Sequence, residues 1–194
     1  FTPVQATLCA AALMFITLAI FVRYLLPYGG EKDGAALFAI PRGIVAFVGV
    51  ICCIAFLVEG AVMDWGGVFL TTLKHMDISM AGTGFAVFSA AMLMMRLTGD
   101  WLVQRFGGKV IVLGGGILSA AGFLLVIFSP WQVLLYAGFF AIGIGSANIV
   151  PIFYSLLGKQ KVMPINMAVS AVSTLGYLGI LMGPAVIGFV AHQT

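Results

Sequence analysis

Two of the six acidic residues in this sequence, Glu59 and Asp64, lie in one apolar stretch, between an uncharged run from Gly43 to Val58 and the mostly apolar residues 66–73. An ionisable side chain within a membrane span is costly, and such residues mark proton relays or tight pairs. Glu59 is therefore a candidate for proton coupling, and the alternative is a structural hydrogen bond to a neighbouring helix. Asp64 lies about 140° further round a helix, so the two carboxylates do not share a face. Together with Trp65, Asp64 fits an outer membrane interface, and it is also a candidate for the substrate path.

A second pair of opposite charges is Arg96 and Asp100. Arg96 follows an apolar run, residues 85–95, which first suggests an anion binder inside the membrane. Trp101 fits the inner interface, however, and a long arginine side chain can extend part of the way toward it. Because Asp100 lies one turn later on the same helix face, we expect a structural Arg96–Asp100 pair.

Further polar groups could line a substrate path. Asn148 precedes Pro151, which disrupts the helix at the carbonyl of Ala147. Asn148 could bind substrate in the resulting kink, or equally satisfy the broken helix. A second kink is expected at Pro184. The other path candidates are Tyr154, Asn166 and Tyr177.

The composition identifies the solvent of this chain as lipid. Of its 194 residues, 62% are hydrophobic and 8% charged, whereas soluble domains carry about 25% charged residues. The net charge of +3 forms no basic stripe with interleaved aromatics, so nucleic acid is not an expected partner. The cysteines and histidines lack the spacing of a metal site, and no cofactor is expected. No catalytic set such as Gly-x-Ser-x-Gly occurs, which disfavours an intramembrane enzyme.

Six apolar segments are long enough to span a membrane as helices. Their length and continuous apolarity exclude membrane strands, so the expected fold class is an all-α membrane protein with six transmembrane helices. Seven Lys and Arg residues fall at one set of helix ends and one, Lys74, at the other, which orients the chain. Runs of small residues, such as Gly114-Gly115-Gly116, predict close helix packing. The expected segments are Val4–Leu26, Gly43–Leu70, Met80–Gln104, Val110–Phe128, Trp131–Leu157 and Ile165–Ala191.

The loop after the third segment resembles the cytoplasmic motif of the major facilitator superfamily, Gly-x-x-x-Asp-Arg-x-Gly-Arg-Arg. Arg105, Gly107 and Lys109 fit this motif, whereas Asp100 stands at its leading Gly and Gln104 at its Asp. Other stretches agree in order: 59–65 resembles the seventh helix of bacterial members related to the sugar permeases, 143–151 the tenth helix and 179–188 the eleventh. The resemblance implies the sixth to eleventh of twelve helices. It assigns 1–26 to the N-terminal half, 27–42 to a cytoplasmic linker between the halves, and 43–194 to the C-terminal half without its last helix.

This resemblance implies secondary active transport of a small solute by alternating access, in the inner membrane of a bacterium. Proton coupling is expected because the sequence contains no Gly-x-x-x-x-Gly-Lys-Ser/Thr phosphate loop. The expected partners are the lipid bilayer, a small-molecule substrate and the missing N-terminal half. An alternative is a receptor-like or scaffold protein that keeps the fold without transport, which the altered motif at Asp100 and Gln104 allows.

Overall fold

The computed structural model describes residues 3–24 and 40–193, which divide into two units, 1–35 and 36–194. The first unit holds helix α1 (Pro3–Phe21) and the short turn η1 (Val22–Tyr24). Most of the expected linker, residues 27–39, lies outside the described residues. The chain belongs to an all-α membrane protein, because six helical spans have the length and composition to cross a bilayer and the described residues contain no strand.

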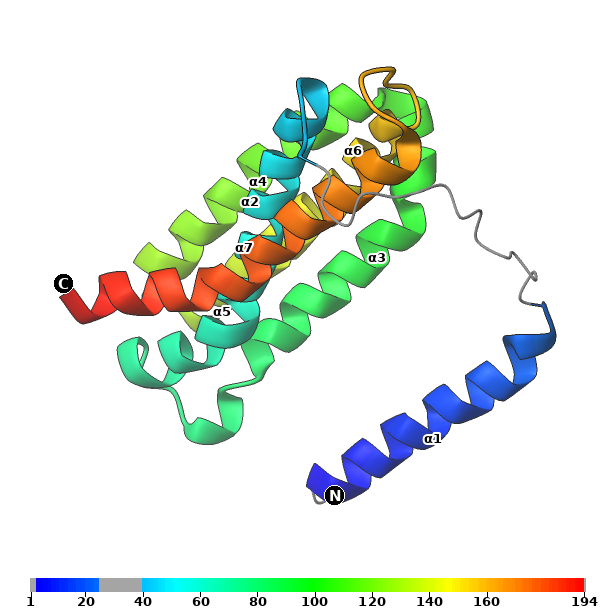
Figure 1. Cartoon of the computed structure of the whole chain (residues 1–194). Coiled ribbons are helices and arrows are strands. Elements are labelled where there is room, and N and C mark those ends of the chain that lie inside the picture. The colour runs from blue at the N-terminus through cyan, green and yellow to red at the C-terminus, as the bar shows by residue number, and fades with distance from the viewer. Residues whose placement is uncertain (1–2, 25–39, 194) are drawn as a thin grey trace. The chain divides into compact units, whose positions relative to one another are not determined.

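The second unit contains five of these spans (Figure 1). Three of the five are each built from more than one helical piece: α2 continues into η2, η3 precedes α3, and α5 is followed by α6. The elements are α2 (Ile44–Val68), η2 (Phe69–Leu73), η3 (Ile78–Met80), α3 (Thr83–Phe106), α4 (Gly108–Phe128), α5 (Gln132–Ser146), α6 (Ile149–Leu157) and α7 (Ile165–Gln193).

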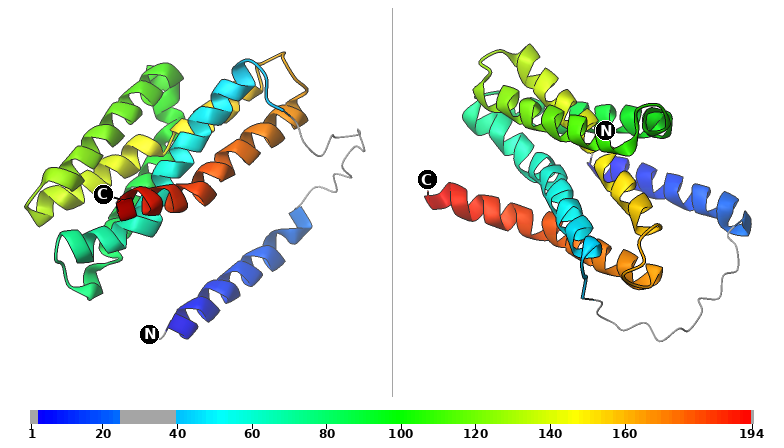
Figure 2. Two further views of the ribbon diagram at one scale, coloured as in Figure 1. Left: turned by 60° about the vertical axis from the view of Figure 1, so that its left-hand side comes forward. Right: turned by 90° about the horizontal axis from the view of Figure 1, so that it is seen from above.

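Small residues allow the helices of this unit to pack closely, as two further views show (Figure 2). α2 lies along α7, and α5 lies against both α3 and α4. A Cβ atom at Gly179 would overlap the Cys53 carbonyl, and one at Gly143 would overlap the Phe88 carbonyl. These backbones therefore approach each other at distances that larger side chains prevent.

The buried side chains form two separate clusters, and α2 contributes to both. We call them the upper and lower core, after their positions in Figure 1. The lower core holds Val62, Leu70, Phe88, Met92, Val126, Leu135, Phe139, Ile142 and Ala147. The upper core holds Val45, Val48, Cys52, Phe153, Leu157, Ala168, Ala171 and Val172.

Helical structure is interrupted within the fifth span, at Ala147 and Asn148. α5 ends at Ser146 and α6 begins at Ile149. Pro151 lies in the first turn of α6, where its missing N–H costs no helical hydrogen bond. By contrast, α7 continues as one helix through Pro184.

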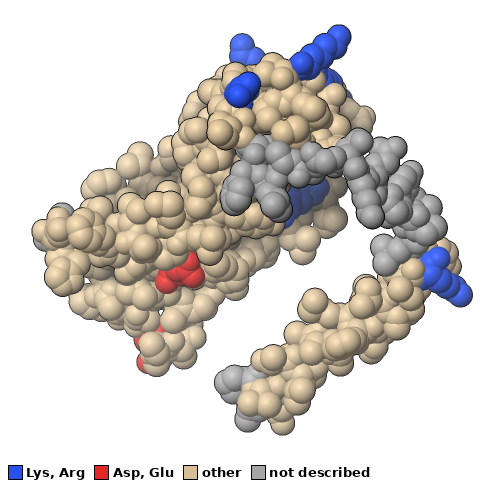
Figure 3. All heavy atoms as spheres, in the orientation of Figure 1, with Lys and Arg blue, Asp and Glu red and all other residues tan. Residues whose placement is uncertain are grey.

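Most basic residues of the second unit gather at one end (Figure 3), where α2 begins, α3 turns into α4, and α6 leads to α7. Lys74 lies at the other end, where its Nζ donates hydrogen bonds to the carbonyls of Ile127 and Ser129, at 2.8 and 2.9 Å. This lysine thereby ties η2 to the C-terminus of α4, where a cation is favourable.

Candidate functional site

An ion pair joins α2 to α3 in the middle of their lengths. Nη2 of Arg96 lies 3.5 Å from Oε1 of Glu59, and the two side chains are 47% and 18% exposed. This distance exceeds the 2.7–2.9 Å typical of a charge-assisted hydrogen bond, and Glu59 Oε1 is buried with no hydrogen-bond partner among the described residues. The contact therefore compensates charge without fixing the carboxylate in place.

The expected pairing of Arg96 with Asp100 is wrong. The ion pair found for Arg96 in the described residues is the one with Glu59. An i, i+4 spacing places two residues on one helix face, but a carboxylate from the facing helix competes for the same guanidinium. Glu59 is less exposed than Asp100, so it has the greater need of a counter-charge.

A cavity of about 380 Å³ lies beside this pair and brings several expected residues together. Arg96, Asp100, Asn148 and Tyr154 all line it, contributed by α3 and by the α5–α6 span. Phe56, Val150 and Pro151 complete its lining. The site is thus a recess between helices with a largely apolar lining that also carries one cation, one carboxylate, one amide and one phenol.

Asn148 is held against α3 and is buried. Its Nδ2 donates a hydrogen bond to the Met95 carbonyl at 3.3 Å. Gly99 leaves the space for this amide, since a Cβ there would overlap the Asn148 side chain. The amide therefore bridges the break in the fifth span to the neighbouring helix.

Tyr154 and Phe56 connect the cavity to α7. The hydroxyls of Tyr154 and Ser173 share a hydrogen bond of 2.8 Å. Phe56 stacks on Tyr177 with ring centroids 5.8 Å apart and 5° between the planes. Tyr177 thus lies behind a lining residue rather than in the lining.

Two other expected path residues lie away from this cavity. Asp64 is exposed near the end of α2, and Asn166 is exposed in the first turn of α7. Neither belongs to the lining of the cavity beside Arg96.

The loop motif forms the turn between α3 and α4. Gly107 has a φ of 81°, a conformation that favours glycine. The Arg105 guanidinium lies over Trp101 and Phe106, 5.8 and 5.9 Å from the ring centroids. Gln104, which stands at the acidic position of the motif, is exposed beside it.

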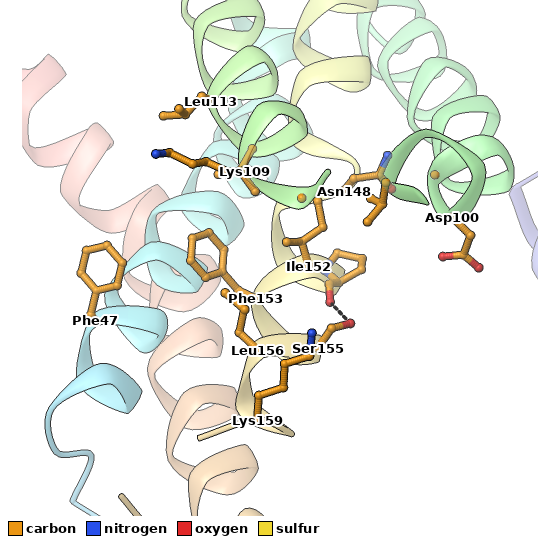
Figure 4. A pocket seen from close by; sticks show the side chains of 15 residues that line it. Phe47, Asp100, Lys109, Leu113, Asn148, Ile152, Phe153, Ser155, Leu156 and Lys159 are labelled. Carbon is orange, nitrogen blue, oxygen red and sulfur yellow. Dashed lines mark hydrogen bonds between the residues drawn. The ribbon is translucent and has the colours of Figure 1, made fainter. Parts of the chain in front are cut away.

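A larger cavity of about 640 Å³ opens beside this turn (Figure 4). It shares Asp100, Asn148 and Pro151 with the smaller one. Figure 4 shows Asp100 on one side and Lys109 on the other, so these two charges do not meet. The recess between α3 and α6 thus continues from Arg96 toward the basic end of the unit.

Sequence reasoning missed Phe56, Ser173 and the structural role of Lys74. Apolar residues and lone hydroxyls carry no signal in such an apolar sequence. In the described residues, no group of three or more His, Cys, Asp or Glu side chains could hold a metal ion.

Comparison with known proteins gives consistent results. The family model described as Major Facilitator Superfamily matches residues 66–194. An uncharacterized MFS-type transporter of Yersinia pestis is 44% identical over 190 residues, which cover 98% of this chain and 50% of that protein. An uncharacterized transporter of Sinorhizobium fredii is 33% identical over 162 residues, covering 84% of this chain and 43% of that protein.

A phosphoglycerate transporter protein of Salmonella typhimurium is 22% identical over 138 residues, covering 71% of this chain and 30% of that protein. The chain thus spans half or less of the length of these relatives. No solved structure matches the chain. The family match and the Yersinia relative show that this chain belongs to the major facilitator superfamily.

Proposed function

We propose that the full-length protein is a secondary transporter, which carries a small solute across the bacterial inner membrane by alternating access and couples this movement to protons at Glu59. The second unit supplies most of one half of the transporter. Helix α1 belongs to the other half, and residues 27–42 link the two. Transporters of this kind bind their substrates near the midplane, between the halves.

The observation that carries the proposal is the Glu59–Arg96 pair. Both residues lie more than about two turns from the nearer helix end, and Glu59 lies about 22 Å along α2 from Ile44 at 1.5 Å per residue. A partly buried carboxylate with one partner at 3.5 Å can lose that contact when it takes up a proton. Arg96 lines the neighbouring cavity, so a change of charge at Glu59 acts through Arg96 on the space where a solute would bind.

The test is uphill uptake by full-length protein in proteoliposomes, with a labelled panel of sugars, amino acids, carboxylates and phosphate esters. Under an inward proton gradient, we expect the wild-type protein to accumulate a solute from the panel. Glu59→Gln, which cannot exchange a proton, should only equilibrate that solute. Asp64→Asn is the matched control, because it removes an exposed carboxylate of the same helix, and it should accumulate like wild type.

Uphill accumulation by Glu59→Gln would exclude Glu59 from coupling. If the wild-type protein moved no solute in either direction, the transport proposal would fail in favour of a receptor-like or scaffold role.

A further inference from the structure

Arg96 has more hydrogen-bonding capacity than its neighbours use. A guanidinium carries five N–H donors in a planar fork. In the described residues, its one ionic partner is Glu59, and its side chain makes no hydrogen bond there. About half of the side chain is exposed, and it lines the cavity beside the pair. Such free donors in a membrane span suit a carboxylate or phosphate, which the fork can bind through two parallel bonds.

The rest of the cavity lining fits a small organic molecule around such a group. Asn148 uses one N–H on α3, so its carbonyl oxygen and second N–H stay available. The Tyr154 hydroxyl shares one hydrogen bond with Ser173 and can make another. Phe56, backed by Tyr177, supplies a flat apolar wall. A volume of about 380 Å³ lies at the small end of ligand pockets.

From these contacts we propose that Arg96 binds the carboxylate or phosphate group of the transported solute, in competition with Glu59. This inference rests on the proposed function and names the class of its substrate. When Glu59 takes up a proton, its attraction for Arg96 ends and the solute's anionic group takes its place. The proton and the solute therefore bind together, and each raises the affinity for the other by the same factor.

The charges around the site set the direction of the pH dependence. With Glu59 ionised, the charges of Glu59, Arg96 and Asp100 sum to −1, which repels an anion. With Glu59 protonated, the same groups sum to zero. α7 contains no Asp or Glu. The affinity for the anion should therefore rise as the pH falls. Asp100 adds a contact for the ammonium group of a zwitterionic solute.

The experiment measures how much each probe stabilises the purified full-length protein against heat, since a ligand of the native state raises the unfolding temperature. The probes are lactate, alanine and 3-phosphoglycerate, with lactamide and glycerol as neutral controls. We expect at least one anionic or zwitterionic probe to stabilise the protein, more strongly at acidic than at alkaline pH, and neither neutral control to do so. A preference for alanine over lactate that Asp100→Asn abolishes would identify the solute as zwitterionic.

Three variants test the role of Arg96. Arg96→Gln should weaken binding of the effective probe about 10- to 100-fold, as the loss of a hydrogen-bonded charge implies. Arg96→Lys keeps the charge without the fork, and it should weaken binding less. Arg105→Gln makes the same change on the same helix outside the cavity, and it should bind like wild type. Glu59→Gln should bind the anion equally well at both pH values.

The inference is overturned if lactamide stabilises the protein as well as lactate, if no charged probe has an effect, or if Arg96→Gln and Arg96→Lys retain wild-type affinity. The experiments distinguish failure of the anion site from failure of the proposed transport function. Glu59-dependent accumulation of a neutral solute would refute the anion site and keep the transporter. Anion binding at Arg96 without any Glu59-dependent uptake would refute the proton-coupled transporter and keep the anion site.

Discussion

Replacing Gly115 by Ala should separate α4 from α5, whereas the same change at the adjacent Gly114 should not. A Cβ at Gly115 would overlap the carbonyl oxygen of Gly145, and a Cβ at Gly114 would have no atom within 4 Å. Overpacking costs about 1–3 kcal/mol, and the gain in helix propensity from Gly to Ala is about 0.5–1 kcal/mol at either position. We therefore expect Gly115→Ala to destabilise the protein by up to roughly 2.5 kcal/mol and Gly114→Ala to be neutral or mildly stabilising.

The comparison requires thermal unfolding of both full-length variants in the same detergent, with tryptophan fluorescence as the readout of unfolding. The gain in helix propensity is the same in both variants. The difference between their free energies of unfolding therefore gives the cost of the overlap with Gly145, which we expect to be about 1–3 kcal/mol. Gly115→Val should widen this difference. Equal unfolding temperatures for Gly114→Ala and Gly115→Ala would refute the close approach of the two backbones.

Three further predictions follow from other contacts. In a cysteine-free background, a cysteine at the exposed Ile78 should react with an impermeant thiol reagent added to cells, and one at Lys161 should not; the opposite pattern would reverse the orientation. Hydrogen bonds from Ser79 lower the pKa of Asp77. At pH values above the unfolded-state pKa of this carboxyl, its ionised form therefore stabilises the N-terminus of η3. This contribution is lost as pH falls through the lowered pKa, so hydrogen exchange of residues 78–81 should increase in strong acid, and in Asp77→Asn this acid-induced increase should be absent. Gly99→Ala should displace the Asn148 amide and reduce solute uptake, an effect that normal uptake by the variant would disprove.

The sequence predicts the helices well, because their apolar runs are long and hydropathy is a local property. It also indicates the interruption near Asn148, since the effect of Pro151 acts on its own helix. Contacts between helices are different, because they depend on how each helix is rotated and placed against its neighbours. The i, i+4 spacing therefore suggested Asp100 as the partner of Arg96, whereas the packing of α2 on α3 brings Glu59 to it.

The same limit applies to the small-residue face of α4. Three consecutive glycines are equivalent in the sequence, and the rotation of α4 against α5 determines that Gly115 is the one in contact. Phe56 could not be singled out among 16 phenylalanines, because its stacking on Tyr177 depends on how α2 and α7 lie together.

The walls of the Arg96 cavity belong to two different cores. Arg96 extends from α3, whose Phe88 and Met92 are part of the lower core. Tyr154 extends from α6, whose Phe153 and Leu157 are part of the upper core. The two cores meet at Ala147–Asn148, where no continuous helix stiffens the span. Because Asn148 also lines the cavity, a change of backbone geometry at this break would alter the cavity, whereas α2, a continuous helix that contributes to both cores, would resist any displacement of one core against the other.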